Sequence, residues 1–278
     1  MTIAELLELD DCRLVEPSFA ELTEDFYTGL LLRALADEAR LLLDEEEEPL
    51  ALALHDDAGW HAVSFLFRPP TLAALECFEA IGGDLYQVPK EDWLHAVREF
   101  YSNEICRTVL PAFEDLSGDR PGMIADLIRE VWGGRTGDLC LDCCCGSGVG
   151  TAALRACGMR SLAYDNDPAL LSLGLSRGRL IPGETLLIDG TAASTYVNPA
   201  PLGAALMAGE IHSYNADLWE QIIDQLLALV DEALVTVGTE PEVVRVEAWC
   251  AERGRETEVF ENERDPLYDR WCCVARRI

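Results

Sequence analysis

Short apolar runs alternate with helical patterns over the second half of the chain. The run 139–145 is apolar apart from Asp142, and similar runs follow at 160–164, 185–188, 204–208 and 234–237. Runs of this kind are typical of strands that are buried on both faces of a parallel sheet. The segments between them carry apolar residues at helical spacing, most regularly over 218–230. The alternation predicts an α/β domain in which strands are followed by helices.

Both ends of this domain can be placed from the same pattern. Pro121 can begin a helix whose apolar residues recur as far as Val131, and Gly133 and Gly134 end it. At the other end, 243–250 reads as a helix, and 256–261 and 270–276 read as two last strands. The likeliest boundary is therefore 118–121, which divides the chain into an N-terminal region, 1–117, and a domain of residues 118–278.

The N-terminal region shows mainly helical patterning around one β-hairpin. Helices are predicted within 14–43, at 72–81 and at 91–113, and strands at 50–54 and 60–67 flank the turn residues 56–59. The acidic run 44–48 is predicted to be a solvated loop. Trp93, Phe100 and Tyr101 recur at helical spacing, which favours core packing over a place in a pocket.

Acidic residues dominate the charge of the chain. Asp and Glu number 51 against 21 Lys and Arg, which gives a net charge of −30. Proteins that bind RNA or DNA through phosphates normally show a basic patch, and the sequence shows none. The composition therefore disfavours a nucleic-acid partner. Solubility in a salty cytoplasm is one explanation for the excess of acid, and the sequence does not decide it.

The eleven cysteines invite a metal-site interpretation that the spacing does not support. Cys140-x-x-Cys143 is half of a zinc spacing, but the other half is missing. Cys143, Cys144 and Cys145 alternate between the faces of a strand and its turn, so they cannot converge on one ion. We expect small buried thiols and no metal site.

No membrane association is predicted from the sequence. There is no leader with a basic start and an apolar middle, and no apolar run approaches the ~18 residues that a bilayer span requires. We expect a cytoplasmic protein; its oligomeric state is not determined by the sequence.

The chemistry of the chain centres on the glycine-rich turn 142–151 between a predicted strand and a helix. Glycines at 146, 148 and 150 let a ligand approach the backbone, and the following helix presents free N–H groups. A nucleotide-like ligand fits such a turn. The spacing matches the dinucleotide fingerprint G-x-G-x-x-G poorly, because the third glycine is displaced.

The same turn resembles motif I of the class I S-adenosylmethionine (SAM)-dependent methyltransferases, D-x-G-x-G-x-G. Asp142, Cys144, Gly146 and Gly148 stand at the motif positions, with Cys144 in place of the first glycine. The resemblance covers about residues 121–278. It implies an α/β fold with a seven-stranded Rossmann-like methyltransferase sheet, helices on both faces and a reversed pair of strands at the end.

The resemblance also implies roles for residues after the later strands. Asp165 would accept hydrogen bonds from the ribose hydroxyls, and Asp189 would meet the adenine amine. The groups after the fourth strand would face the methyl group, which makes Glu210, His212 and Tyr214 candidate catalytic residues, and in a continued strand Glu210 and His212 would share a face. The full set of implied SAM contacts is Asp142, Cys144, Gly146, Ser147, Gly148, Asp165, Asn166, Asp189 and Gly190.

The acceptor stays open at this stage. Family members that modify nucleobases carry an N/D-P-P-Y/F motif after strand four, and the similar segment 198–201 lacks the aromatic residue and reads as a loop before that strand. We therefore expect a methyltransferase acting on a small molecule or a protein side chain. The alternatives are an RNA methyltransferase and a non-catalytic partner protein with a SAM fold. By analogy with the family, residues 1–117 would cap the cofactor and shape the acceptor pocket.

Overall fold

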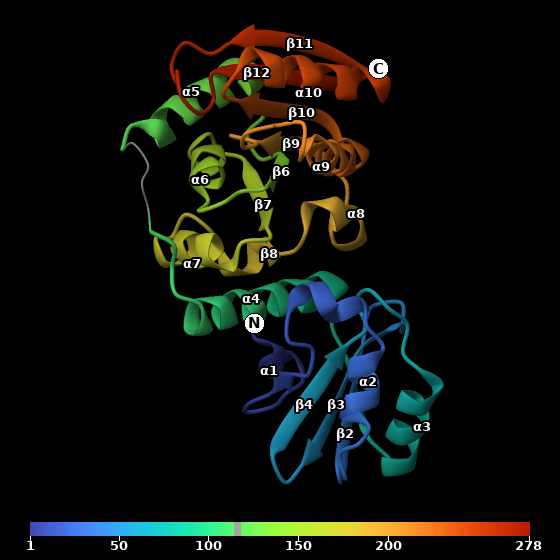
Figure 1. Ribbon diagram of the computed structural model, residues 1–278. Coiled ribbons are helices and arrows are strands. Elements are labelled where there is room, and N and C mark those ends of the chain that lie inside the picture. Colours follow the sequence, from blue (N-terminus) through green and yellow to red (C-terminus); the bar gives the residue numbers. More distant parts are fainter. Residues whose placement is uncertain (114–117) are drawn as a thin grey trace. The chain divides into compact units, whose positions relative to one another are not determined.

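The computed structural model describes residues 1–113 and 118–278, which form two compact units. One unit is Met1–Asn103 and the other is Glu104–Ile278, so the division falls within helix α4, Lys90–Thr108 (Figure 1). The predicted boundary, 117/118, lies later in the chain. Residues just after the division belong to the second unit because Ser172 donates a hydrogen bond to the carbonyl of Val109, and Ala112 donates one to the carbonyl of Ala169.

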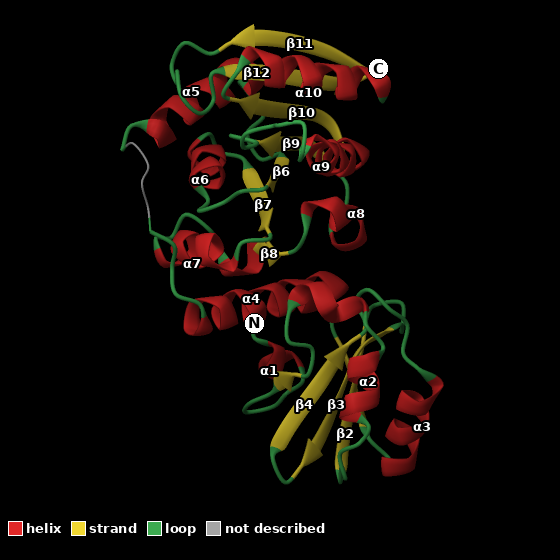
Figure 2. Ribbon diagram, viewed as in Figure 1, coloured by secondary structure: helices red, strands yellow, loops and turns green. Residues whose placement is uncertain are grey.

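The N-terminal unit is built on a five-stranded sheet with the order β1-β4-β3-β2-β5 (Figure 2). Its strands are β1 (Arg13–Leu14), β2 (Glu38–Leu43), β3 (Pro49–Asp56), β4 (Gly59–Ser64) and β5 (Asp84–Gln87). Its helices before α4 are α1 (Ile3–Leu6), η1 (Phe19–Thr23), α2 (Phe26–Leu31) and α3 (Leu72–Ile81). The predicted hairpin is confirmed as the antiparallel pair β3–β4.

The helix predicted within 14–43 is wrong in its last part. Residues 38–43 form the strand β2, which pairs with β3 on one side and β5 on the other. Leu41 and Leu42 point to opposite faces of the sheet and both are buried. The acidic run forms a turn, as predicted, but Asp44 is buried and accepts the N–H groups of Glu46 and Glu48. Trp93 and Tyr101 lie in the core, as predicted.

The C-terminal unit contains the predicted seven-stranded sheet. The strand order is β11-β12-β10-β9-β6-β7-β8, and β12 is antiparallel to both of its neighbours while the remaining pairs are parallel. The strands are β6 (Leu139–Cys143), β7 (Arg160–Asp165), β8 (Thr185–Leu187), β9 (Ala200–Ala205), β10 (Val230–Val237), β11 (Arg255–Glu261) and β12 (Trp271–Arg277).

Helices cover both faces of this sheet (Figure 1). α5 and α6 pack together on one face, and α9 and α10 lie on the other. The helices and 3-10 turns are α5 (Arg120–Trp132), α6 (Val149–Ala156), α7 (Pro168–Ser176), η2 (Pro182–Glu184), η3 (Gly190–Ala192), α8 (Ala193–Tyr196), α9 (Ala216–Leu229) and α10 (Glu240–Glu252). α7 begins at Pro168, and the Asp167 carboxylate caps it by accepting the N–H groups of Ala169 and Leu170. The cysteines of β6 and β12 are buried thiols, as expected.

The fourth strand of the domain begins earlier than predicted. β9 is Ala200–Ala205 rather than 204–208, and the segment 198–201, predicted as a loop, contains its start. Pro201 is tolerated there because the ladder with β6 begins only at Leu202, so its missing N–H costs no bond to β6. β9 therefore ends at Ala205. Glu210 and His212 lie in the loop that follows and not in a continued strand.

Among the described residues, no helix combines the length and the apolar character that a membrane span requires.

Candidate cofactor and acceptor site

A cavity of about 700 Å³ opens at the carboxyl ends of β6, β7 and β9. Strand order reverses at β6, because β7 lies on one side of it and β9 on the other. In open α/β sheets such a reversal leaves a crevice where ligands bind. Of the implied SAM contacts, the cavity is lined by Asp142, Cys144, Gly146, Ser147, Asp165, Asn166 and Gly190.

The glycine-rich turn has a backbone that most residues cannot adopt. Gly146 has φ +53° and Gly148 has φ +73°, both in the left-handed region that favours glycine. A Cβ at Gly148 would lie 2.6 Å from the Leu180 side chain. Cys144 has φ +53° although it is not glycine, which agrees with its place at a position where the family motif has glycine. Both the backbone conformation and the close packing against Leu180 therefore favour glycine in this turn.

Asp165 joins the turn to the end of β7. Its carboxylate accepts the N–H of Gly146 at 2.8 Å on one oxygen and the N–H of Asp167 at 2.8 Å on the other. The residue is 8% exposed, and burial raises the pKa of the carboxyl group despite these bonds. Each carboxylate oxygen has two lone pairs, so both can accept a further donor from a ligand in the cavity.

Asp142 lies at the base of the same cavity. It is 1% exposed, and Thr151 donates a short hydrogen bond to it. Burial raises the pKa of Asp142 to about 7, and the hydrogen bond from Thr151 opposes that shift. Gly150 leaves room for this carboxylate, since a Cβ there would lie 3.3 Å from it.

A buried hydrogen-bond network, which the sequence did not predict, lies at the wall of the cavity that Arg120 lines. Arg120, at the start of α5, donates two hydrogen bonds to Asp269, at 3.2 and 3.0 Å. Asp269 also accepts the hydroxyl of Thr236, which in turn accepts the N–H of Met207. The network thereby ties the turn after β9 to the loop between β11 and β12. The one signal in the sequence for this network is the predicted reversed pair of strands at the end of the domain. Such a pair places the loop between β11 and β12 at the carboxyl edge of the sheet.

A second cavity, of about 550 Å³, adjoins the first. The two share the lining residues Met207, Gly209 and Tyr268. Glu210 and His212 line the second cavity, and their side chains are 2.9 Å apart. The site therefore has two compartments that meet after β9.

Three predicted site residues line neither cavity. Gly148 is packed against Leu180, and Asp189 is exposed, with its carboxylate accepting the N–H and hydroxyl of Thr191. Tyr214 is 83% exposed and stacks near His212, with ring centroids 5.3 Å apart. It lines neither cavity.

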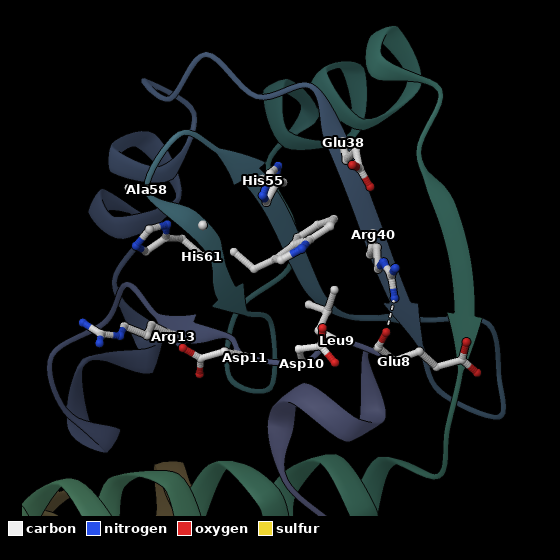
Figure 3. Close-up of a pocket in the computed structure, with 12 residues that line it drawn as sticks. Glu8, Leu9, Asp10, Asp11, Arg13, Glu38, Arg40, His55, Ala58 and His61 are labelled. Carbon is white, nitrogen blue, oxygen red and sulfur yellow. Dashed lines mark hydrogen bonds between the residues drawn. The ribbon is translucent and has the colours of Figure 1, made fainter.

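The N-terminal unit has its own cavity, of about 590 Å³ (Figure 3). Arg40 lines this cavity, donates a hydrogen bond to the carbonyl of Glu8 at 2.7 Å, and has its guanidinium over the ring of Trp60. His55 and Glu38 line it, and with Asp37 they form the one group among the described residues that could hold a metal ion. The group is largely exposed and belongs to no motif, so the cavity shows no specific chemistry.

Comparisons with known proteins bear on the fold alone. No family model matches the chain, and no curated protein matches it. The structure is similar to that of magnesium protoporphyrin IX methyltransferase from Synechocystis PCC 6803 with bound SAM, at 12% identity and a TM-score of 0.47, over 68% of this chain and 98% of that one.

Two further structures show a similar fold. The ribosomal protein L11 methylase from Lactobacillus delbrueckii subsp. bulgaricus matches at 13% identity and a TM-score of 0.45, over 70% of this chain and 86% of that one. A candidate RNA methyltransferase from Pyrococcus horikoshii matches at 15% identity and a TM-score of 0.44, over 63% and 94%. The strand order of the C-terminal unit is by itself that of a seven-stranded Rossmann-like sheet.

Proposed function

We propose that the protein is a SAM-dependent methyltransferase that modifies a small molecule or a protein side chain. The observation that carries the proposal is the buried Asp165 carboxylate, bonded to the N–H of Gly146 at the rim of a cavity on the switch point of the sheet. A carboxylate in this place, beside a glycine-rich turn, can accept the two hydroxyls of a ribose.

The residues present fit SAM as the methyl donor. The cavity volume of about 700 Å³ falls in the range of ligand pockets. Asp142 and Asp165 place acidic groups beside it, which suits a ligand that carries a positive sulfonium. SAM supplies an electrophilic methyl group: the acceptor's lone pair forms the new bond to carbon, the carbon–sulfur bond breaks with its electrons on sulfur, and S-adenosylhomocysteine (SAH) is left.

The protein would promote the transfer mainly by holding the acceptor and the methyl donor in the right relative position. The second cavity would hold the acceptor, and its shared wall with the first would bring the reacting atoms together, which is the main requirement of an in-line transfer. Where the acceptor must lose a proton, the Glu210–His212 pair can take it, because His212 lines the cavity and its ring nitrogen is hydrogen-bonded to Glu210.

Calorimetry with SAM and SAH tests the proposal. We expect the wild type to bind both, and Asp165→Ala to lose at least about 100-fold in affinity, because hydrogen bonds to a charged group contribute about 1.5–3 kcal/mol each. Asp138→Ala is the matched control, since Asp138 precedes β6 at the opposite edge of the sheet and, among the described residues, its carboxylate pairs only with Arg135 on the surface. It should bind like the wild type.

The binding result also separates the alternatives. Absence of SAM and SAH binding in a folded wild-type protein would overturn the proposal and leave a non-catalytic protein with this fold. An unchanged affinity in Asp165→Ala would refute the role of that residue. Methylation of RNA, with a binding affinity that falls steeply with salt, would replace the proposed acceptor class by the nucleic-acid one.

A further inference from the structure

The second cavity contains an arginine that no acidic side chain neutralises. Arg245, on α10, lines this cavity, and within the described parts of the chain its guanidinium has no hydrogen-bond or ion-pair partner. The other arginine at the two cavities, Arg120, is bonded to Asp269. We propose that Arg245 binds the carboxylate or phosphate of a small organic acceptor, an inference that rests on the proposed function.

The acids of the same cavity are already engaged. Glu242 accepts the N–H of Ile211 on one oxygen, and the N–H and hydroxyl of Thr239 on the other. Glu210 is bonded to His212. These bonds leave the guanidinium of Arg245 as the charged group of the cavity that is available to a ligand.

An arginine without an acidic partner is notable in a chain with so many acidic residues. With 51 acidic residues and 21 basic ones, an arginine has many possible partners, and several in the C-terminal unit are paired. Examples are Arg253 with Asp224, Arg264 with Glu130 and Arg276 with Glu232. Arg245 instead lies at the compartment that would hold the acceptor. An anionic acceptor would also be repelled by the acidic surface elsewhere and attracted here.

The other residues that line the second cavity indicate what the rest of the acceptor is like. It is largely apolar, with Met207, Ile211, Pro241, Leu267 and Tyr268. A guanidinium presents a planar fork of donors that matches the two oxygens of a carboxylate or phosphate. The cavity therefore suits a small molecule with an apolar body and one anionic end, and its methyl-accepting atom would lie toward the shared wall at Gly209.

Paired probes test this inference on the intact protein saturated with SAH. The probes are 4-hydroxybenzoate, indole-3-acetate and phenyl phosphate, each with an uncharged partner: 4-hydroxybenzamide, indole-3-acetamide and phenol. Ligand-observed nuclear magnetic resonance gives the affinities. For the wild type we expect at least one anionic probe to bind about tenfold more tightly than its uncharged analogue. Comparing the carboxylate probes with phenyl phosphate shows which of the two anions the cavity prefers.

Variants decide whether Arg245 causes the preference. Arg245→Gln should abolish it and Arg245→Lys should keep part of it, with unchanged melting temperatures because the side chain has no partner among the described residues. Arg177→Gln is the matched control, since Arg177 is exposed, its side chain has no hydrogen-bond or ion-pair partner among the described residues, and it lines neither cavity. It should behave like the wild type.

Each other outcome is decisive. Equal binding of anions and neutral partners, no binding of any probe, or a preference that survives in Arg245→Gln would overturn the inference while SAH binding leaves the proposed function standing. Failure of SAH to bind in the first step would instead overturn the proposed function, and the inference with it.

Discussion

At residue 144 a cysteine occupies a backbone conformation that favours glycine. Its φ of +53° is costly for residues with a Cβ and most costly for β-branched ones. We therefore expect Cys144→Gly to be better tolerated than Cys144→Val, although valine is closer to cysteine in size. Urea unfolding measures this, and Val should destabilise by about 2 kcal/mol more than Gly.

The neighbouring Cys143 is the matched control for this comparison. It lies in β6, where valine is favoured and glycine is not. Cys143→Val should therefore be milder than Cys143→Gly, the reverse of the order at 144. The same order at both positions would show that backbone conformation does not decide the residue at 144.

Asp142 should give the protein a pH-dependent stability. Its folded-state pKa is raised to about 7 from an ordinary 3.8, so its contribution to stability is fully present below about pH 4 and is lost as the pH rises through 7. Asp142→Asn cannot titrate. The unfolding free energy of the wild type minus that of Asp142→Asn should fall by about 2 kcal/mol between pH 5 and pH 7, since one pKa unit corresponds to about 1.4 kcal/mol. A constant difference would show that this carboxyl group titrates normally.

At the scale of elements, the loop between β11 and β12 is fixed by Asp269. Asp269→Asn would remove one of the two buried carboxylates that face Arg120, the other being Asp265 at 3.8 Å, and breaking one half of a buried pair costs about 3–5 kcal/mol. Because Asp265 remains, we expect a loss at the lower end of that range in urea unfolding. Affinity for SAM should fall as well, because the network also holds the N–H of Met207 at the cavity wall.

An exposed ion pair that joins the two ends of the same loop provides the control. Glu261 and Arg270 are paired at the surface, where such pairs contribute about 0–1 kcal/mol. Glu261→Gln should therefore change stability and SAM affinity little. Equal effects of Asp269→Asn and Glu261→Gln would contradict the role given to the buried network.

The elements also show which parts of the site the sequence could predict. Asp165 and the turn around Gly146 were predicted because strand, turn and acid follow one another within about 25 residues of chain, and local patterns record local structure. Arg120 and Asp269 were missed because their contact joins positions 149 residues apart and exists only in the folded sheet. β9 was misplaced for a related reason. Pro201 indicates a loop locally, whereas pairing with β10 and β6 makes it part of a strand.

At the scale of the whole molecule, the net charge of −30 should make the fold sensitive to salt. Self-repulsion destabilises a compact acidic chain, and salt screens it, with a Debye length that falls from about 10 Å at 0.1 M toward 3 Å at 1 M. Salt also weakens the surface ion pairs, but these are individually worth little. We expect the melting temperature to rise between 0.05 and 0.5 M KCl. A fall would mean that ion pairs outweigh the excess of acid.

The two units differ in how far the sequence predicted them. The C-terminal unit carries motif I after β6 and acidic residues after β7 and β8, so its fold followed from the resemblance. The N-terminal unit has no such motif. Its hairpin β3–β4 was predicted, whereas β2 was not, because its apolar residues also fit helical spacing. β5 was not predicted because its parallel pairing with β2 leaves no signal in a single sequence. The role of residues 1–117 in capping the cofactor stays a prediction.

A crystal structure of the protein with SAH is the most direct test of the proposed cofactor site. We expect SAH in the cavity at the ends of β6, β7 and β9, with its ribose hydroxyls bonded to Asp165 and its sulfur facing the compartment that Glu210, His212 and Arg245 line. SAH bound elsewhere, or a cavity that stays empty at saturating SAH, would contradict it.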